Sequence, residues 1–294
     1  MERVLIGIDQ EQASQVAVDW VIERAATVAI QVKLFTAFDM LVDNPVADND
    51  ILAATRHRIQ AACPTVDVEV ELADRSILEG LIERSADADL VVIGSHPHRH
   101  VRSVLTGAFP SAVVTRSHCA TVVVPDDWAP GRSGIVLGAA DDDSSDAATV
   151  WAAREAMARD TELTAVHAWH LPVAAMDAVT SIIVLPEDLE AVHAELLQRV
   201  THRIGASAPS VSIRTVLRHG NAALELDGVL DSAALLVLGT RGHGPAVGTL
   251  LGSVVQHMLH HGQVPVCVVP EPAPSDASSL TREASRESRV GTAR

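Results

Sequence analysis

The chain repeats itself, and this repeat limits its fold more than any other feature of the sequence. Three pairs of segments align: VLIGIDQEQAS (4–14) with IVLGAADDDSS (135–145), LVVIGS (90–95) with LLVLGT (235–240), and ATVVVP (120–125) with PVCVVP (265–270). The first offset is 131, which also places Trp20 on Trp151, and the offset from Gly94 onward is 145. Self-similarity of this length predicts two related domains in tandem.

The repeat also divides the chain into segments. We expect a domain at 1–127, a linker at 128–134, a second domain at 135–270 and a disordered tail at 271–294. The linker is predicted from the proline and glycines of DDWAPGRSG, and the tail from its lack of large apolar residues apart from Leu280 and Val290. The second copy is 14 residues longer, and we place this insertion in LPVAAMDAVTSIIVLP.

Each copy alternates short β-branched runs with longer alanine-rich segments of helical periodicity. In the second copy we expect strands at 135–139, 163–169, 211–217, 235–239 and 265–270, and helices at 145–159, 187–204, 222–231 and from Ser253. Apolar strands between helices are typical of a parallel sheet that is covered on both faces, so each half should be a doubly wound α/β domain. Ser14 and Ser145 are the expected N-caps of the first helices, and Trp20 and Trp151 should pack in the cores.

Composition excludes several classes of partner and location. The net charge is −16 with only 22 basic residues, which argues against a nucleic-acid surface. No apolar run is long enough to cross a membrane and the N-terminus has no signal-peptide pattern, so we expect a cytoplasmic protein that does not contact membranes. The three cysteines lack metal-site spacing and are expected to serve packing.

The segment GTRGHGPAVGTLLGS (239–253) carries the strongest functional signal. Gly239 ends an expected strand, and ligands of open parallel sheets bind at the carboxyl ends of strands. Gly252 and Ser253 open the next helix, where unpaired N–H groups and the helix dipole favour phosphate. The alternative is that the glycines only permit a tight turn. GKS, GKT and G-x-G-x-x-G patterns are absent at the relevant strands, which argues against a P-loop and a dinucleotide site.

The spacing G-x2-G-x9-G-S of this loop resembles the ATP-binding signature of the universal stress protein family. VHAW (166–169), RHG (218–220) and the ending VPVCVVP are similar to the same family, and the likeness covers 1–127 and 133–270. The resemblance implies five-stranded parallel domains, tandem or dimeric assembly, and ATP held by the loop. By this likeness Gly138, Ala139 and Ala168 lie against the ribose and adenine.

The loop supplies the rest of the predicted ATP site. The residues are Gly239, Thr240, Arg241, Gly242, His243, Gly244, Gly252, Ser253 and Val254. Arg241 and His243 are candidate phosphate neighbours, with solvated side chains as a comparable alternative. Asp141, Asp142 and Asp143 follow Ala140 in this copy, and carboxylates beside a triphosphate favour a magnesium or manganese ion, although nothing in the sequence requires one.

The first copy departs from the pattern. Its loop GSHPHRHVRSVLTGA (94–108) has Pro97 in place of the second glycine and Ala108 in place of the serine, so it should be a poor phosphate cradle. It keeps Asp9, where the family usually has an aspartate near the nucleotide. We therefore expect one ATP per chain, bound by the C-terminal copy.

Histidines are numerous, but metal binding is not the favoured interpretation. His96, His98 and His100 share one loop, and His257, His260 and His261 share one helix. Neither set has an acidic or cysteine partner at ligand spacing, so surface histidine is the better interpretation and no metal site is expected. No catalytic set can be proposed from the sequence either.

We therefore expect a non-catalytic, ATP-binding regulatory protein of the stress response that acts on itself or on an unknown protein partner. A slow ATPase or phosphotransferase and a nucleotide-free interaction module are the alternatives. The strands ATVVVP and PVCVVP are apolar enough to be sheet edges, and uncovered edges of this kind find partners. We expect these two to pair, which makes the chain a pseudo-dimer, and two chains to associate further as a homodimer.

Overall fold

A computed structural model describes residues 1–38, 45–96, 108–140, 145–170, 186–240 and 251–271. The strands are β1 Glu2–Gly7, β2 Ile30–Phe38, β3 Asp67–Asp74, β4 Leu90–Ser95, β5 Ala120–Pro125, β6 Ile135–Gly138, β7 Leu163–Trp169, β8 Ile213–His219, β9 Leu235–Gly239 and β10 Val266–Val269. The helices are α1 Gln12–Ala25, α2 Pro45–Ala62, α3 Ile77–Ser85, α4 Ala108–Arg116, α5 Asp146–Ala158, α6 Pro186–Ser207, α7 Ala222–Asp227 and α8 Ser253–His261. The expected insertion and tail lie almost wholly outside the described residues.

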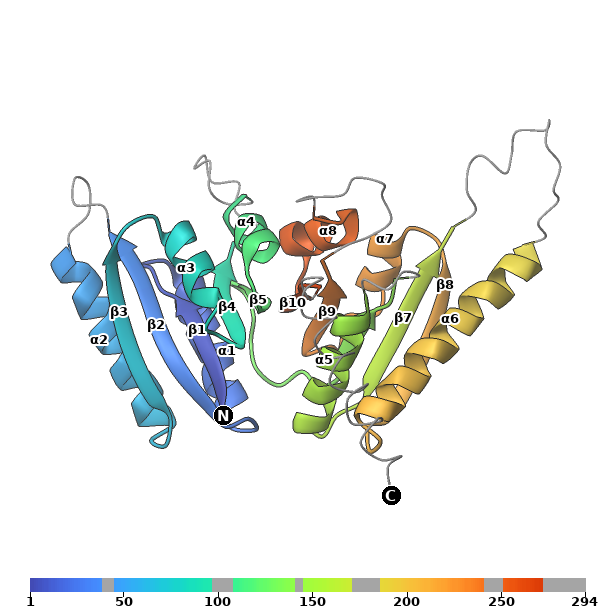
Figure 1. Cartoon of the computed structure of the whole chain (residues 1–294), viewed down its shortest axis with the longest axis horizontal. Helices are drawn as coiled ribbons and strands as arrows, with labels where there is room; N and C mark the ends of the chain where they lie inside the picture. Colours follow the sequence, from blue (N-terminus) through green and yellow to red (C-terminus); the bar gives the residue numbers. More distant parts are fainter. Residues whose placement is uncertain (39–44, 97–107, 141–144, 171–185, 241–250, 272–294) are drawn as a thin grey trace, which may run out of the picture.

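All the strands join one sheet in the order β3-β2-β1-β4-β5-β10-β9-β6-β7-β8. Within each half the neighbouring strands are parallel, which confirms the predicted fold class. The two halves meet at β5 and β10, which pair antiparallel with Cys267 opposite Val122. The predicted pairing of the two apolar edges is therefore confirmed, and Figure 1 shows the halves side by side across this seam.

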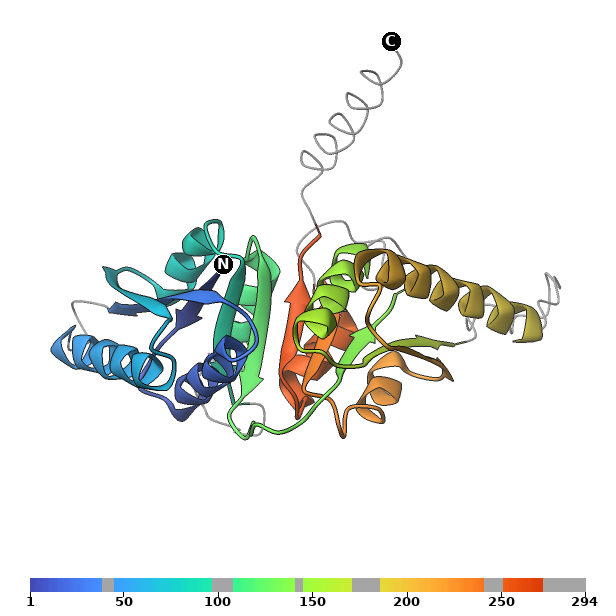
Figure 2. The ribbon, with the colours of Figure 1, turned by 90° about the horizontal axis from the view of Figure 1, so that it is seen from below.

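Helices cover both faces of the sheet, and each face has its own hydrophobic core. One core packs α1, α2, α5 and α6 against the strands, and the other packs α3, α4, α7 and α8. Both cores contain residues from the two halves, so the apolar interior is continuous across the seam. In Figure 1, α4 and α8 lie above the seam and α1 and α5 below it, and Figure 2 shows β5 and β10 side by side from the other direction.

The ends of the first helices differ in part from the prediction. Glu11, and not Ser14, is the N-cap of α1. Ser14 lies in the first turn, where its buried hydroxyl donates to the Asp9 carbonyl at 2.9 Å. Ser145 does precede α5 as expected.

The two tryptophans of the repeat are not equally buried. Trp20 is 1% exposed, whereas Trp151 is half-buried and packs at the edge of the same core. Among the described residues, none of the helices combines the length and the apolar composition needed to cross a membrane.

Candidate functional site

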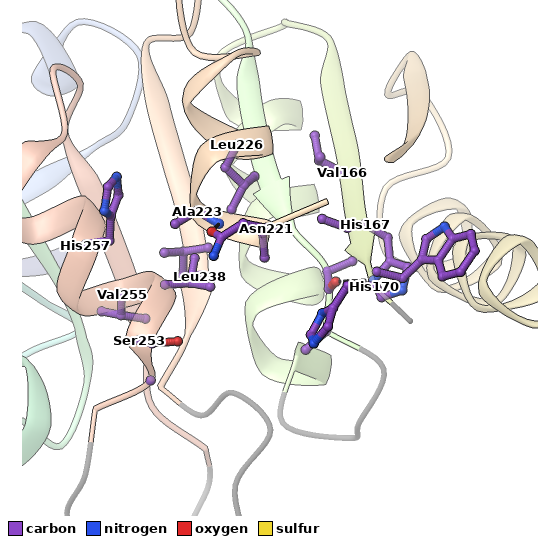
Figure 3. A pocket seen from close by; sticks show the side chains of 18 of the residues that line it. Val166, His167, His170, Asn221, Ala223, Leu226, Leu238, Ser253, Val255 and His257 are labelled. Carbon is purple, nitrogen blue, oxygen red and sulfur yellow. Dashed lines mark hydrogen bonds between the residues drawn. The ribbon is translucent and has the colours of Figure 1, made fainter. Parts of the chain in front are cut away.

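A cavity of about 800 Å³ opens at the carboxyl ends of β6, β7 and β9. Its walls come from these strand ends and from the first turns of α7 and α8, with α6 on one side. Figure 3 shows Leu226, Leu238 and Val255 along its apolar part and Asn221 and Ser253 among its polar groups. The volume is in the range of small-molecule sites, and the position is the one expected for an open parallel sheet.

Many of the residues predicted from the sequence line this cavity. They are Gly138, Ala139, Ala168, Gly239, Gly252, Ser253 and Val254. Thr240 lies beside them, because its carbonyl accepts a hydrogen bond from the Gly252 N–H at 3.4 Å. Arg241, Gly242, His243 and Gly244 lie outside the described residues.

Gly138, at the end of β6, leaves room for the apolar floor of the cavity. A Cβ atom on Gly138 would lie 2.5 Å from Leu238 Cδ2 and 3.4 Å from Leu226 Cδ1. A larger residue would therefore require the end of the Leu238 side chain to shift beneath the cavity. The next residue, Ala139, donates its N–H to the Val166 carbonyl at 2.8 Å, which holds the strand end beside β7.

The start of α8 opens into the cavity. Gly252 is its N-cap, with φ −59° and ψ 148°, and no side chain caps the helix. The hydrogen bond from Gly252 to Thr240 joins this helix start to the end of β9. The N–H groups of a first helical turn have no partner within the helix and carry a partial positive charge, so they can bind an anion. Ser253, which is exposed, adds a hydroxyl donor there.

The start of α7 is capped by its own chain. Asn221 Oδ1 accepts hydrogen bonds from the N–H groups of Ala223, at 3.0 Å, and Leu224, at 3.4 Å. This cap satisfies two of the donors at that helix start. Of the two helix starts at the cavity, the one at Gly252 is thus the better anion site.

Histidines and a tryptophan form the wall beside α6. His167 is 3% exposed; its Nδ1 lies 2.7 Å from the Ala139 carbonyl and its Nε2 lies 2.8 Å from His193 Nδ1. A carbonyl only accepts, so Nδ1 of His167 carries the proton, and with both rings neutral His193 donates to Nε2. Trp169 stacks on His193, with ring centroids 5.1 Å apart, and meets His219 edge-on.

One of the histidines predicted to lie on the surface belongs to this site. His257 lines the cavity, and its Nε2 lies 2.8 Å from Asp227 Oδ2, which joins α8 to α7. Asp227 is distant in sequence, so the spacing on the helix alone gave no sign of this partner. The other two, His260 and His261, are exposed as predicted.

The equivalent region of the N-terminal half is arranged differently. Asp9 is exposed, and its Oδ1 accepts the Glu11 N–H at 2.9 Å. His96 is not a free surface residue as predicted, because its Nδ1 lies 2.7 Å from Asp126 Oδ2 and both side chains are about 15% exposed. Ala108 begins α4 as Ser253 begins α8. Pro97, His98 and His100 lie outside the described residues.

Within the described part of the chain, no group of three or more His, Cys, Asp or Glu side chains is placed to hold a metal ion. The three aspartates Asp141, Asp142 and Asp143, which motivated the magnesium or manganese prediction, lie outside that part. The metal prediction therefore stays a prediction.

Several residues that line the cavity were not predicted from the sequence. Those on strand ends, Val166, His167 and Trp169, are neighbours of the predicted Ala168 and could have been found by strand position. His193 and Leu189 come from α6, which follows the 14-residue insertion, so the repeat gave no register for them. Asn221 carried a signal, because asparagine after RHG is a typical N-cap.

Comparison with known proteins gives concordant matches. The model of the "Universal stress protein family" matches residues 1–125 and 133–270. "Universal stress protein Rv2005c" of Mycobacterium tuberculosis is 31% identical over 211 residues, covering 69% of each chain, and "Universal stress protein Rv2623" of the same organism is 27% identical over 91% of this chain and 96% of its own. The crystal structure of a universal stress protein from Archaeoglobus fulgidus matches with a TM-score of 0.69 at 16% identity, covering 91% of this chain and 98% of the other.

Proposed function

The chain belongs to the universal stress protein family, and from this membership and the geometry of the cavity we propose that it is a regulatory protein that binds ATP in its C-terminal half. Its nucleotide-bound state would change contacts with itself or with a protein partner during stress. The proposal assigns it no catalytic role and a cytoplasmic location.

The observation that carries this proposal is the position of the α8 helix start. Gly252 and Ser253 line the same cavity as Ala139 and Ala168, so a phosphate donor set and an apolar strand-end surface face one space. A nucleotide needs both, because its phosphates are strongly charged and its base is flat and largely apolar. The cavity of about 800 Å³ is large enough for such a ligand.

The charge of the protein makes local donors necessary. The net charge of −16 repels a polyphosphate at long range, so binding has to come from short-range hydrogen bonds. Backbone N–H groups of the α8 start and the Ser253 hydroxyl supply them without basic side chains. Leu226, Leu238 and Val166 provide apolar surface in the same cavity.

Binding is tested by isothermal titration of the purified full chain with ATP and magnesium, together with native mass spectrometry of the protein as isolated. We expect one ATP per chain. Ser253→Ala removes one donor to a charged group and should weaken binding about tenfold. Gly252→Val places a branched side chain at the mouth of the phosphate site and should remove most binding.

The matched control is Gly205→Val. Gly205 lies on α6, and a Cβ atom there meets no atom within 4 Å, so this variant introduces the same side chain away from the cavity. It should bind ATP as the parent does. Equal binding by the parent and the Gly252→Val variant would show that ATP does not use this helix start.

Two further measurements separate the alternatives. In a single-turnover experiment, release of labelled phosphate faster than nucleotide dissociation, lost in Gly252→Val, would indicate a slow ATPase or phosphotransferase. A protein that carries no nucleotide when isolated and shows no thermal shift with ATP would be an interaction module that has kept the fold alone.

A further inference from the structure

Two buried side chains of opposite charge meet where the halves of the chain join. Arg24 lies on α1 of the N-terminal half and Glu155 on α5 of the C-terminal half, and each side chain is 3% exposed. The Arg24 guanidinium donates through Nη1 to Glu155 Oε1. This hydrogen-bonded ion pair crosses the seam on the face of the sheet that α1 and α5 cover.

The two positions are equivalent in the repeat. Arg24 and Glu155 are 131 positions apart, which is the offset that relates Trp20 to Trp151. In the sheet beside them Val122 pairs with Cys267, and these residues are also equivalent, at the second offset of 145. The axis that relates the halves therefore passes between the members of each pair.

This symmetry has a direct consequence for alternative pairings. If two N-terminal halves met in the same geometry, Arg24 would face a second Arg24. If two C-terminal halves met, Glu155 would face a second Glu155. Only unlike halves bring opposite charges together at this buried point.

Neighbouring charges strengthen the distinction. Arg24 Nε also donates to Glu2 at 2.7 Å, and Arg159 Nε donates to Glu155 at 2.7 Å. The order across the seam is therefore Glu2, Arg24, Glu155, Arg159, with charges that alternate in sign. Pairing of like halves would place two like charges next to each other in the middle of this row, where burial makes repulsion strong.

The acid in this row is held in its charged form. Burial raises the pKa of Glu155, but the charges and hydrogen bonds of Arg24 and Arg159 outweigh burial and bring that pKa below its ordinary value. The Arg24 guanidinium also lies 5.6 Å from the Trp20 ring centroid and 5.9 Å from that of Trp151, so equivalent indoles from both halves flank it. The pair is thus a charged contact in an apolar setting.

We infer that Arg24 and Glu155 determine which seams can pair, so that each half of this chain accepts the other half and rejects its own kind. The partner that fits an N-terminal seam is a universal-stress-type domain with an acid at this position. A second copy of the chain can exchange seams only head to tail, N-terminal half to C-terminal half. This inference concerns the seam and does not depend on nucleotide binding.

The test reverses one charge at a time and then mixes the products. Arg24→Glu gives a chain with glutamate at both positions, and Glu155→Arg gives a chain with arginine at both. Alone, each variant has like charges at its own seam. In a mixture, opposite charges meet in every pairing between the two variants, including N-terminal half with N-terminal half and C-terminal half with C-terminal half, which the parent charges disfavour.

A natural thiol reports the pairing of like halves. In the parent chain Cys267 faces Val122, which is its equivalent in the repeat. Joining two C-terminal halves would therefore place Cys267 directly opposite the Cys267 of the second chain. Directly opposed residues of antiparallel strands have Cα atoms about 4.5 to 5.5 Å apart, which suits a disulfide. Cys63→Ala and Cys119→Ala in all the chains leave Cys267 as the single thiol.

The chains are unfolded with reductant, mixed, and refolded with oxidised glutathione, and cross-linked dimers are measured by non-reducing electrophoresis and peptide mass mapping. We expect the mixture to give about tenfold more Cys267–Cys267 dimer than either variant alone, because opposite charges at the seam should shift the pairing equilibrium by a factor of about ten. Equal amounts in the mixture and in the separate samples would overturn the inference.

The matched control uses an exposed ion pair within the N-terminal half. Arg3→Glu and Asp89→Arg make the same charge changes at side chains that are 55% and 43% exposed, and their mixture should give no gain in dimer. If the seam variants do not fold alone, the mixture still decides: recovery of cooperatively melting protein only on mixing supports the inference, and no recovery overturns it. Thermal stability of both single variants equal to that of the parent would also overturn it.

Discussion

Replacing His167 with leucine tests how the wall of the cavity is held. The substitution keeps a buried side chain of similar size but removes both ring nitrogens. The Ala139 carbonyl then loses its 2.7 Å donor and His193 Nδ1 loses its 2.8 Å partner. Each lost hydrogen bond costs about 1 kcal/mol, and a buried group left without a partner costs about 1 to 3 kcal/mol.

Leucine regains part of this loss by burying more apolar surface. We therefore expect the free energy of unfolding to fall by about 2 kcal/mol, a factor of about 30 in the ratio of folded to unfolded protein. Because Ala139 lines the cavity, ATP affinity should fall as well.

Urea unfolding followed by tryptophan fluorescence measures this change as a shift of the midpoint at constant slope. His167→Asn is the informative comparison, because its amide N–H can donate to the Ala139 carbonyl but cannot reach His193. It should recover about half of the loss. A leucine variant as stable as the parent, or more stable, would refute the argument that these two hydrogen bonds hold the wall.

Changes at Asp9, Glu155 and Cys119 have separately measurable outcomes. Asp9→Ala should leave the stoichiometry at one ATP per chain and change the affinity little in calorimetry, because Asp9 cannot supply phosphate donors; loss of binding would move the site to the N-terminal half. The pKa of Glu155 is lowered in the folded state, so the ionised carboxylate stabilises the fold above the pKa of the unfolded chain. This stabilisation is lost as the pH falls through the folded-state pKa, and acid unfolding curves of the parent and Glu155→Gln should converge in that acidic range. Burial, with a smaller contribution from Asp89, raises the pKa of Cys119 to about 12, so iodoacetamide at pH 8 should label it slowly in the folded protein and rapidly in urea, as mass spectrometry will report.

Much of the fold could be predicted because the repeat and the strand patterns are local properties of the sequence. The apolar runs ending at Gly94 and Gly239 became β4 and β9, and the last apolar run of each copy became the seam. The site residues were predicted where a motif coincided with a strand end and a helix start, as at Gly239 and Gly252, and both of these line the cavity. These positions depend on backbone geometry, which glycine and serine indicate directly.

The remaining features depend on distances that no local pattern encodes. His193 reaches the cavity only because α6 packs against β7, and α6 begins after the insertion. The partner of His257, Asp227, lies 30 positions away on another helix. The helix α7 ends at Asp227 and not at 231, because Gly228 follows as its C-cap and donates its N–H to the Leu224 and Leu226 carbonyls.

The seam explains why the N-terminal half is needed even if it binds no nucleotide. Val266, Cys267 and Val268 of β10 are each at most 2% exposed, and β5 is the strand that covers their edge. Without β5, the C-terminal half would present an unpaired apolar strand with open N–H and C=O groups, which is an aggregation site. Glu155 would also lose the Arg24 guanidinium at a buried position, and an acid that loses one of its partners there is costly. The N-terminal half therefore supports the proposed ATP site through the sheet edge and the ion pair that it supplies, and its own loop is free to diverge as Ala108 and Pro97 have done.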